Sequence, residues 1–138
     1  MTAPGGRATP EDQIAAIGLA ARRIATVVAD GHEVAITHGN GPQVGNLLVK
    51  NEIAASVVPP VPLDWCGAQT QGTVGFVLLN ALQRSLTEIG AARPVGAVVT
   101  RTLVDAGDPA FARPTRPIGR YLTADEACAR MGVKAATL

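Results

Sequence analysis

A glycine-flanked loop between an apolar segment and a helix constrains the fold of this 138-residue chain more than any other feature. Residues 36–46 read ITHGNGPQVGN, in which two glycines flank Asn40 and a proline follows the second glycine. The apolar residues before the loop predict a short buried strand that ends at Thr37. Pro42 suits the first turn of a helix, so we expect a helix from Pro42 to about Ser56.

The segments on either side of this loop continue the alternation of helices and strands. Thr9 is a suitable N-cap for the first helix, and Thr123 with Glu126 forms a capping box for the last one. Asp64 can cap the long helix between them. The predicted elements are, in order, a helix over 9–31, a strand over 32–37, helices over 42–56 and 64–90, a strand over 93–104 and a short helix over 123–132. This order predicts an α/β fold with a mainly parallel sheet.

Two strands are too few for the helices that this order places around them. A two-stranded sheet would not cover the apolar faces of three helices, and no predicted strand precedes the first helix. We therefore expect the sheet to be incomplete at both ends of the chain, or to depend on a partner.

Composition and charge exclude several classes of function. Hydrophobic residues make up 47% of the chain and charged residues 17%, which is sufficient for a packed core. The net charge is +1 and the Lys and Arg residues are scattered, so the basic surface of a nucleic-acid-binding protein is lacking. No apolar run reaches membrane-spanning length, and residues 1–13 do not read as a secretory signal. We expect a cytoplasmic protein without nucleic-acid or membrane partners, in which Cys66 and Cys128 are reduced thiols rather than a disulfide.

The loop itself indicates a site for a small anion. Gly39 and Gly41 remove the side chains that would block an anion from the main-chain N–H groups, and Asn40 adds a polar side chain. The helix that begins at Pro42 directs its positive end at the loop. The pattern lacks the G-K-[ST] of a phosphate-binding P-loop, and its third glycine comes one residue too late for the dinucleotide fingerprint. A purely structural glycine turn is the alternative, and the local pattern alone favours a ligand only slightly.

Four longer stretches carry a family resemblance. They read EVAITHGNGPQVGNLL, VPPVPLDWCGAQTQG, VTRTLVDAGDPAF and PTRPIG, and they occur in this order between about Glu11 and Ala127. Together they resemble carbamate kinase, of the amino-acid-kinase superfamily. The resemblance implies a three-layer αβα sandwich, of which residues 1–138 would form a partial domain, the carbamate-binding half. It also implies that residues 106–138 belong to a protruding subdomain.

The resemblance implies an activity and site residues. Carbamate kinases reversibly transfer a phosphoryl group between carbamoyl phosphate and ADP, giving ATP and carbamate, in arginine catabolism. They require Mg²⁺ and act as homodimers. By resemblance, Gly39, Asn40 and Gly41 would bind the carbamate or carbamoyl end of the substrate. Arg116 would take the catalytic position of a lysine that reaches the phosphoryl group, with a planar guanidinium in place of a point charge. The sequence itself offers no His, Cys and Asp cluster with metal-ligand spacing.

Two parts of the family pattern have no counterpart in these residues. The family's first strand, with its Gly-Gly-Asn loop, is one, and the half that holds the nucleotide is the other. We therefore expect this chain alone to be inactive as a kinase. A different class of function is a non-catalytic binding module that dimerises through the glycine-bearing helix over 65–89. A dinucleotide-binding domain is the weakest candidate, because it needs an acidic residue about twenty residues after the loop, and Asp64 comes later and follows prolines.

Overall fold

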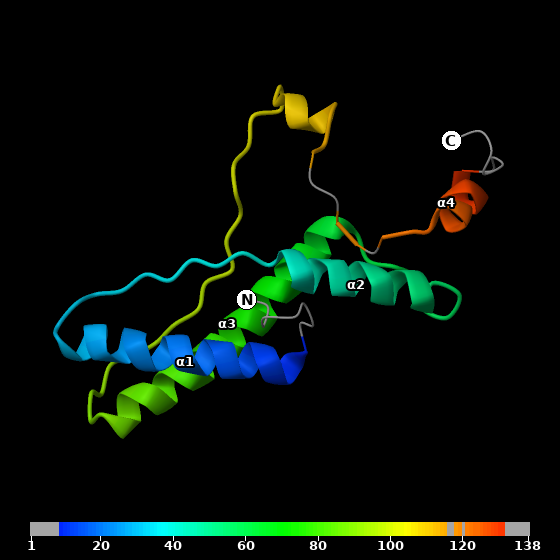
Figure 1. Ribbon diagram of the computed structural model, residues 1–138. Helices are drawn as coiled ribbons and strands as arrows, with labels where there is room; N and C mark the ends of the chain where they lie inside the picture. The colour runs from blue at the N-terminus through cyan, green and yellow to red at the C-terminus, as the bar shows by residue number, and fades with distance from the viewer. Residues whose placement is uncertain (1–8, 116–117, 120, 132–138) are drawn as a thin grey trace.

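The computed structural model describes residues 9–115, 118–119 and 121–131. Three helices make up its body: α1 (Pro10–Ala29), α2 (Gly41–Ala54) and α3 (Leu63–Glu88). A short 3₁₀ helix, η1 (Pro109–Phe111), and α4 (Ala124–Met131) follow along the chain. Figure 1 shows α1 lying along α3, and α2 beside the first part of α3, so α3 is the element against which the other two helices pack.

The ends of α1 follow the local signals predicted from the sequence. Thr9 is the N-cap, and its Oγ1 accepts a hydrogen bond from the N–H of Asp12 at 3.2 Å. Pro10 occupies the first turn, where its missing N–H removes no helical hydrogen bond. At the other end Gly31 adopts φ +94°, a left-handed conformation that glycine reaches without strain. The predicted helix over 9–31 is confirmed.

The core lies between α1 and α3. Ile17, Ala21 and Ala25 are the buried residues of α1, and both alanines are completely inaccessible to solvent. Because alanine is small, these two positions let the α3 backbone come close. From α3 the buried apolar side chains are Cys66, Val74, Leu82 and Leu86. Ile14, about one helical turn before Ile17, is 56% exposed.

The predicted strands are not formed as a sheet. Residues 32–39 and 91–105 run as drawn-out chain without regular secondary structure, and no strand is present among the described residues. No backbone hydrogen bond joins the main chain of 33–39 or 92–104 to any other part of the described chain. A ladder needs backbones about 4.8 Å apart, whereas these two segments lie on either side of a groove. The prediction of a mainly parallel sheet is therefore wrong for the described residues, although both segments are extended as expected.

The structure corrects the predicted N-cap of the long helix. Pro62, not Asp64, is the N-cap of α3. Asp64 lies in the first turn, where its Oδ1 accepts from the N–H of Trp65 at 3.0 Å. The end of the helix is as predicted, because Gly90 leaves it with φ +71°. The capping box before α4 is confirmed: the Glu126 carboxylate accepts from the N–H of Thr123 at 2.8 Å, and the Thr123 hydroxyl accepts from the N–H of Glu126 at 3.3 Å.

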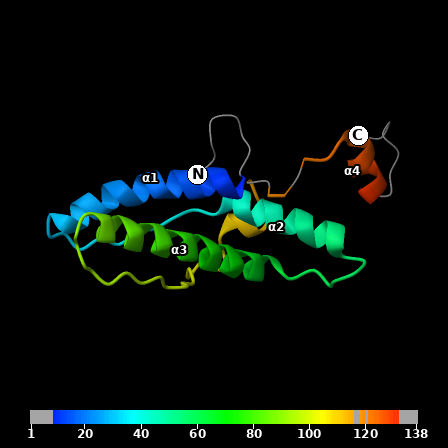
Figure 2. The same cartoon turned by 90° about the horizontal axis from the view of Figure 1, so that it is seen from below.

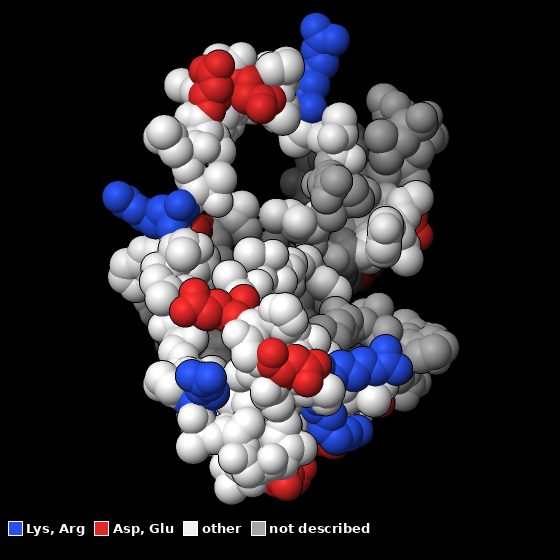
Figure 3. Space-filling model, turned by 90° about the vertical axis from the view of Figure 1, so that its left-hand side faces the viewer, with Lys and Arg blue, Asp and Glu red and all other residues white. Residues whose placement is uncertain are grey.

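Two further findings concern the cysteines and the surface. Cys66 and Cys128 are both free and buried. Acidic and basic side chains are interspersed over the face drawn in Figure 3. Within the described ranges no helix is both long enough and apolar enough to cross a bilayer.

Candidate functional site

The glycine loop lies between the extended segment 32–38 and the start of α2. Gly39 and Gly41 are exposed, and neither has a positive φ. A Cβ built on either residue would meet no atom within 4 Å. The alternative of a purely structural glycine turn finds no support at these two residues, because neither a left-handed conformation nor packing requires glycine at either position. What the two glycines do provide is open access to the main chain of the loop.

Asn40 holds the loop against α3. It is the N-cap residue of α2, but its side chain makes no capping hydrogen bond. Instead its Nδ2 donates to Thr70 Oγ1 at 2.6 Å, and the Thr70 hydroxyl donates to the main-chain oxygen of Gly67 at 2.7 Å. Thr70 is only 2% exposed, so this relay is shielded from water.

The first turn of α2 therefore keeps unused donors. The first helical hydrogen bond runs from the N–H of Val44 to the Asn40 oxygen at 2.9 Å, and Pro42 has no N–H. The main-chain N–H groups of Gly41 and Gln43 donate to no acceptor in the part of the chain that the structure describes. No acidic residue occupies this turn. Two free donors at the positive end of a 14-residue helix form a suitable site for a small anion.

Thr70 is the site residue that the sequence did not reveal. It lies 30 positions from Asn40 and inside a helix, so no local spacing links the two residues. The only available signal was its place in the CGAQTQG stretch, whose glycines are unusual inside a helix.

The other candidate residues add less to this site. The His38 Nδ1 atom lies 3.4 Å from the main-chain oxygen of Gly39, so this exposed ring turns back on its own loop. Arg116, the predicted catalytic residue, lies outside the described residues. The described ranges contain no group of three or more His, Cys, Asp or Glu side chains placed to hold a metal ion. These residues do not fit a Mg²⁺ site, and no step of the function proposed below passes through one.

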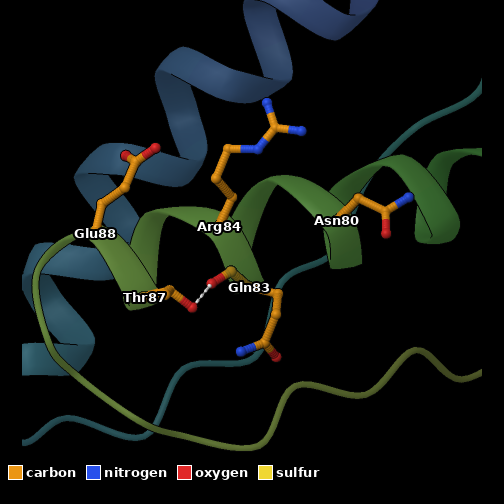
Figure 4. A pocket seen from close by; sticks show the side chains of 5 residues that line it. All are labelled: Asn80, Gln83, Arg84, Thr87 and Glu88. Carbon is orange, nitrogen blue, oxygen red and sulfur yellow. Dashed lines mark hydrogen bonds between the residues drawn. The ribbon is translucent and has the colours of Figure 1, made fainter.

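A surface depression on the second half of α3 is not a candidate site. Figure 4 shows its five lining residues, Asn80, Gln83, Arg84, Thr87 and Glu88, spread along the helix with side chains that do not converge on one point. The Thr87 hydroxyl donates to the main-chain oxygen of Gln83 at 2.8 Å, a bond within the helix. Without convergent polar groups, this surface lacks what a small-molecule site needs.

Comparison with known proteins identifies relatives. The chain is 44% identical over 133 residues to the carbamate kinase-like protein YqeA of Escherichia coli strain K12, a match that covers 92% of this chain and 43% of that protein. It is 42% identical over 120 residues to the carbamate kinase of Thermococcus kodakarensis, which covers 85% of this chain and 38% of that protein. The chain thus spans about two fifths of the length of these relatives. No protein-family model matches it.

A solved structure has the same fold over nearly the whole chain. Carbamate kinase from Giardia lamblia, bound to AMP-PNP, superposes with a TM-score of 0.86 at 36% sequence identity. That match covers 96% of this chain and 42% of the Giardia chain. The helices and extended segments described above therefore have the arrangement found in one part of a carbamate kinase. The 138 residues are homologous to carbamate kinases over most of their own length, and they correspond to a portion of a carbamate kinase that is less than half of its length.

Proposed function

We propose that residues 38–41 and the first turn of α2 bind the carbamate or carbamoyl end of carbamoyl phosphate. In this way the chain would supply one side of the site for reversible phosphoryl transfer between carbamoyl phosphate and ADP. The homology supports the reaction class. One structural observation carries the site: the Asn40 side chain bonds to Thr70 and leaves the N–H groups of Gly41 and Gln43 without an acceptor.

The chemistry of carbamate suits these donors. A carbamate has two carboxylate oxygens, and the main-chain N–H groups of Gly41 and Gln43 can each donate to one of them. Bare glycines allow the ligand to reach the main chain at hydrogen-bonding distance, which a Cβ and longer side chain would hinder. Phosphoryl transfer depends mainly on holding the reactants in line and stabilising the charge that develops. On this proposal, the chain's own contribution is to orient the carbamate.

The proposed reaction also needs a nucleotide and a metal ion. ATP or ADP would be the second substrate and Mg²⁺ the cofactor, and the described residues offer no site for the metal ion. By the resemblance, the nucleotide is held by a part of the kinases without a counterpart in these 138 residues. We therefore propose that the polypeptide of these residues binds carbamoyl phosphate and does not form ATP from it alone.

Thermal unfolding with carbamoyl phosphate tests the proposed site. A ligand at 100 times its Kd adds about 2.7 kcal/mol to the free energy of unfolding. For a chain of this length, that increment raises Tm by roughly 8–10 °C. The control is inorganic phosphate at the same concentration. Equal protection by phosphate would show that the loop binds anions in general, and an unchanged Tm with carbamoyl phosphate would refute the site.

Thr70→Val is expected to weaken carbamoyl phosphate binding about fivefold. The substitution removes the acceptor of the Asn40 side chain, which is then free to cap its own helix and compete for the same N–H groups. Such a capping bond contributes about 1 kcal/mol. The matched control is Thr73→Val, whose exposed hydroxyl bonds only within α3.

A double variant tests the competition directly. Asn40→Ala combined with Thr70→Val removes the competing side chain, so binding should recover relative to Thr70→Val alone. Isothermal titration calorimetry gives the three affinities. If the double variant binds more weakly than the single one, Asn40 contacts the ligand and the competition model is wrong.

A separate structural observation supports a second function, dimerisation. Trp65 and Phe76 are 60% and 66% exposed on α3. They are separated by 11 residues, about three helical turns, and therefore lie on the same side of the helix. Exposed aromatic side chains of this kind are typical of protein interfaces, which supports a homodimer formed through α3. Light scattering should give twice the monomer mass for the natural chain and the monomer mass for Phe76→Ser. A monomeric natural chain would refute this interface.

A further inference from the structure

The sequence at the start of α2 contains both halves of a capping box. In this motif the side chain of the N-cap residue bonds to the main chain of the third helical residue, where a Glu or Gln side chain bonds back to the N–H of the N-cap residue. The residues from Asn40 to Gln43 match this motif, because Asn40 is the N-cap and Gln43 is the third residue of the helix. A closed box would occupy the main-chain N–H groups of both residues.

Neither half of this capping box is closed. The Asn40 side chain bonds to Thr70 instead. The Gln43 side chain reaches α1, where its Nε2 donates to Gln13 Oε1 at 3.1 Å. The Gln43 Oε1 atom is buried and accepts no hydrogen bond within the described chain. The N–H of Asn40 also donates to no acceptor there, although the Gln43 oxygen is the partner that a capping box would give it.

The bond to Gln13 explains why the box stays open. A buried carbonyl oxygen without a donor is costly, because it has lost its hydrogen bonds to water and has gained none in return. Closing the box would remove this cost, but the Gln43 amide is held by Gln13. Helices α1 and α2 pack on α3 and not on each other, so these two long side chains bridge their first turns, which lie side by side in Figure 2.

We infer that Gln13 is a positioning residue for the anion site at the start of α2: by holding the Gln43 side chain, it keeps the N–H of Asn40 free as a third main-chain donor. The inference rests on the proposed binding of carbamoyl phosphate and adds one donor and one positioning residue to that site. Together with the N–H groups of Gly41 and Gln43, three donors are then available to the ligand. A carbamate can use all three, because its two carboxylate oxygens offer about four acceptor positions.

Gln13→Met tests this role. Methionine is close to glutamine in length and helix propensity, but it cannot hold the Gln43 amide. The released amide should turn back and accept from the N–H of Asn40, so the ligand must displace a capping hydrogen bond. Carbamoyl phosphate should therefore bind about fivefold more weakly in isothermal titration calorimetry. The matched control is Gln83→Met, at an exposed residue of α3, which should bind as tightly as the natural chain.

Thermal unfolding separates positioning from a purely structural role. If the bond to Gln13 only held α1 and α2 together, Gln13→Met would lower the Tm of the unliganded chain and leave the affinity unchanged, which would overturn the inference. On the inference, Tm stays the same or rises, because the Gln43 oxygen gains a donor, while the affinity falls. Gln13→Met combined with Gln43→Met has no amide to close the box, so its affinity should recover relative to Gln13→Met alone. A double variant that binds no more tightly than the single one would contradict the inference.

Amide hydrogen exchange at Asn40, followed by NMR, tests the inference without a ligand. In the natural chain the Asn40 N–H should exchange as an unprotected amide, and in Gln13→Met it should exchange at least about fivefold more slowly. Equal rates in the two chains, or protection already in the natural chain, would show that Gln13 does not control this donor. A natural chain that fails to bind carbamoyl phosphate would refute the proposed function, and the exchange rates would still decide whether Gln13 keeps the Asn40 N–H free.

Discussion

Leu86→Ala is expected to lower the free energy of unfolding by about 2–5 kcal/mol, the range for removing a buried leucine side chain. Leu86 is 2% exposed and is one of the two largest fully buried side chains in the described part of the chain. It lies near the end of α3, and its main-chain oxygen accepts the N–H of Ala91 at 2.9 Å, just where the chain leaves the helix. Truncation would leave a cavity in a core that consists of little more than one helix pair.

The measurement is urea unfolding followed by circular dichroism at 222 nm, a wavelength at which α-helices have strong negative ellipticity. The matched control is Leu103→Ala, because Leu103 is 99% exposed and its truncation should change the free energy of unfolding by less than about 0.5 kcal/mol. Similar stability losses in the two variants, or a loss below about 1 kcal/mol at Leu86, would show that the α1–α3 contact is not the core of the folded chain.

Gly39→Val is expected to abolish the stabilisation by carbamoyl phosphate while leaving the unliganded chain as stable as before. A Cβ at Gly39 meets open space, its φ is not positive, and valine suits an extended segment, so the substitution introduces no strain. The branched side chain would instead occupy the space through which a ligand reaches the loop main chain. The full ligand contribution, about 2.7 kcal/mol at 100 times Kd, should therefore be lost.

Thermal unfolding with and without carbamoyl phosphate checks this prediction. The matched control is Gly18→Ala in α1, where the added Cβ would lie 3.9 Å from the Arg22 guanidinium, an ordinary contact. That variant should keep the ligand-dependent rise in Tm. A Gly39→Val chain that keeps the full rise would show that the ligand does not approach through the loop.

The helices could be predicted from the sequence because their signals are local. Thr9, Gly31 and Gly90 lie within one turn of the helix ends that they define, and these ends agree with the predicted bounds 9–31 and 64–90. Asp64 was assigned the wrong role because a proline before it already provides an extended N-cap backbone, and an acidic residue favours the first turn as well as the cap.

Contacts between distant segments could not be predicted in this way. The extended segments were located correctly, but whether they pair depends on their separation across the groove, which no residue pattern encodes. The bond from Asn40 to Thr70 joins residues 30 positions apart, and it changes Asn40 from a helix cap into a tether for the loop. The loop residues were therefore found from the sequence, whereas the reason for their free donors was found only in the structure.

The most direct test of the carbamate site is a titration of the ¹⁵N-labelled chain with carbamoyl phosphate, followed through its amide resonances. The proposal predicts saturable shifts at the N–H groups of Gly41 and Gln43, the two free donors at the start of α2. Inorganic phosphate at the same concentrations should produce much smaller shifts. If carbamoyl phosphate moves other resonances and leaves those of Gly41 and Gln43 in place, the loop is not the carbamate site.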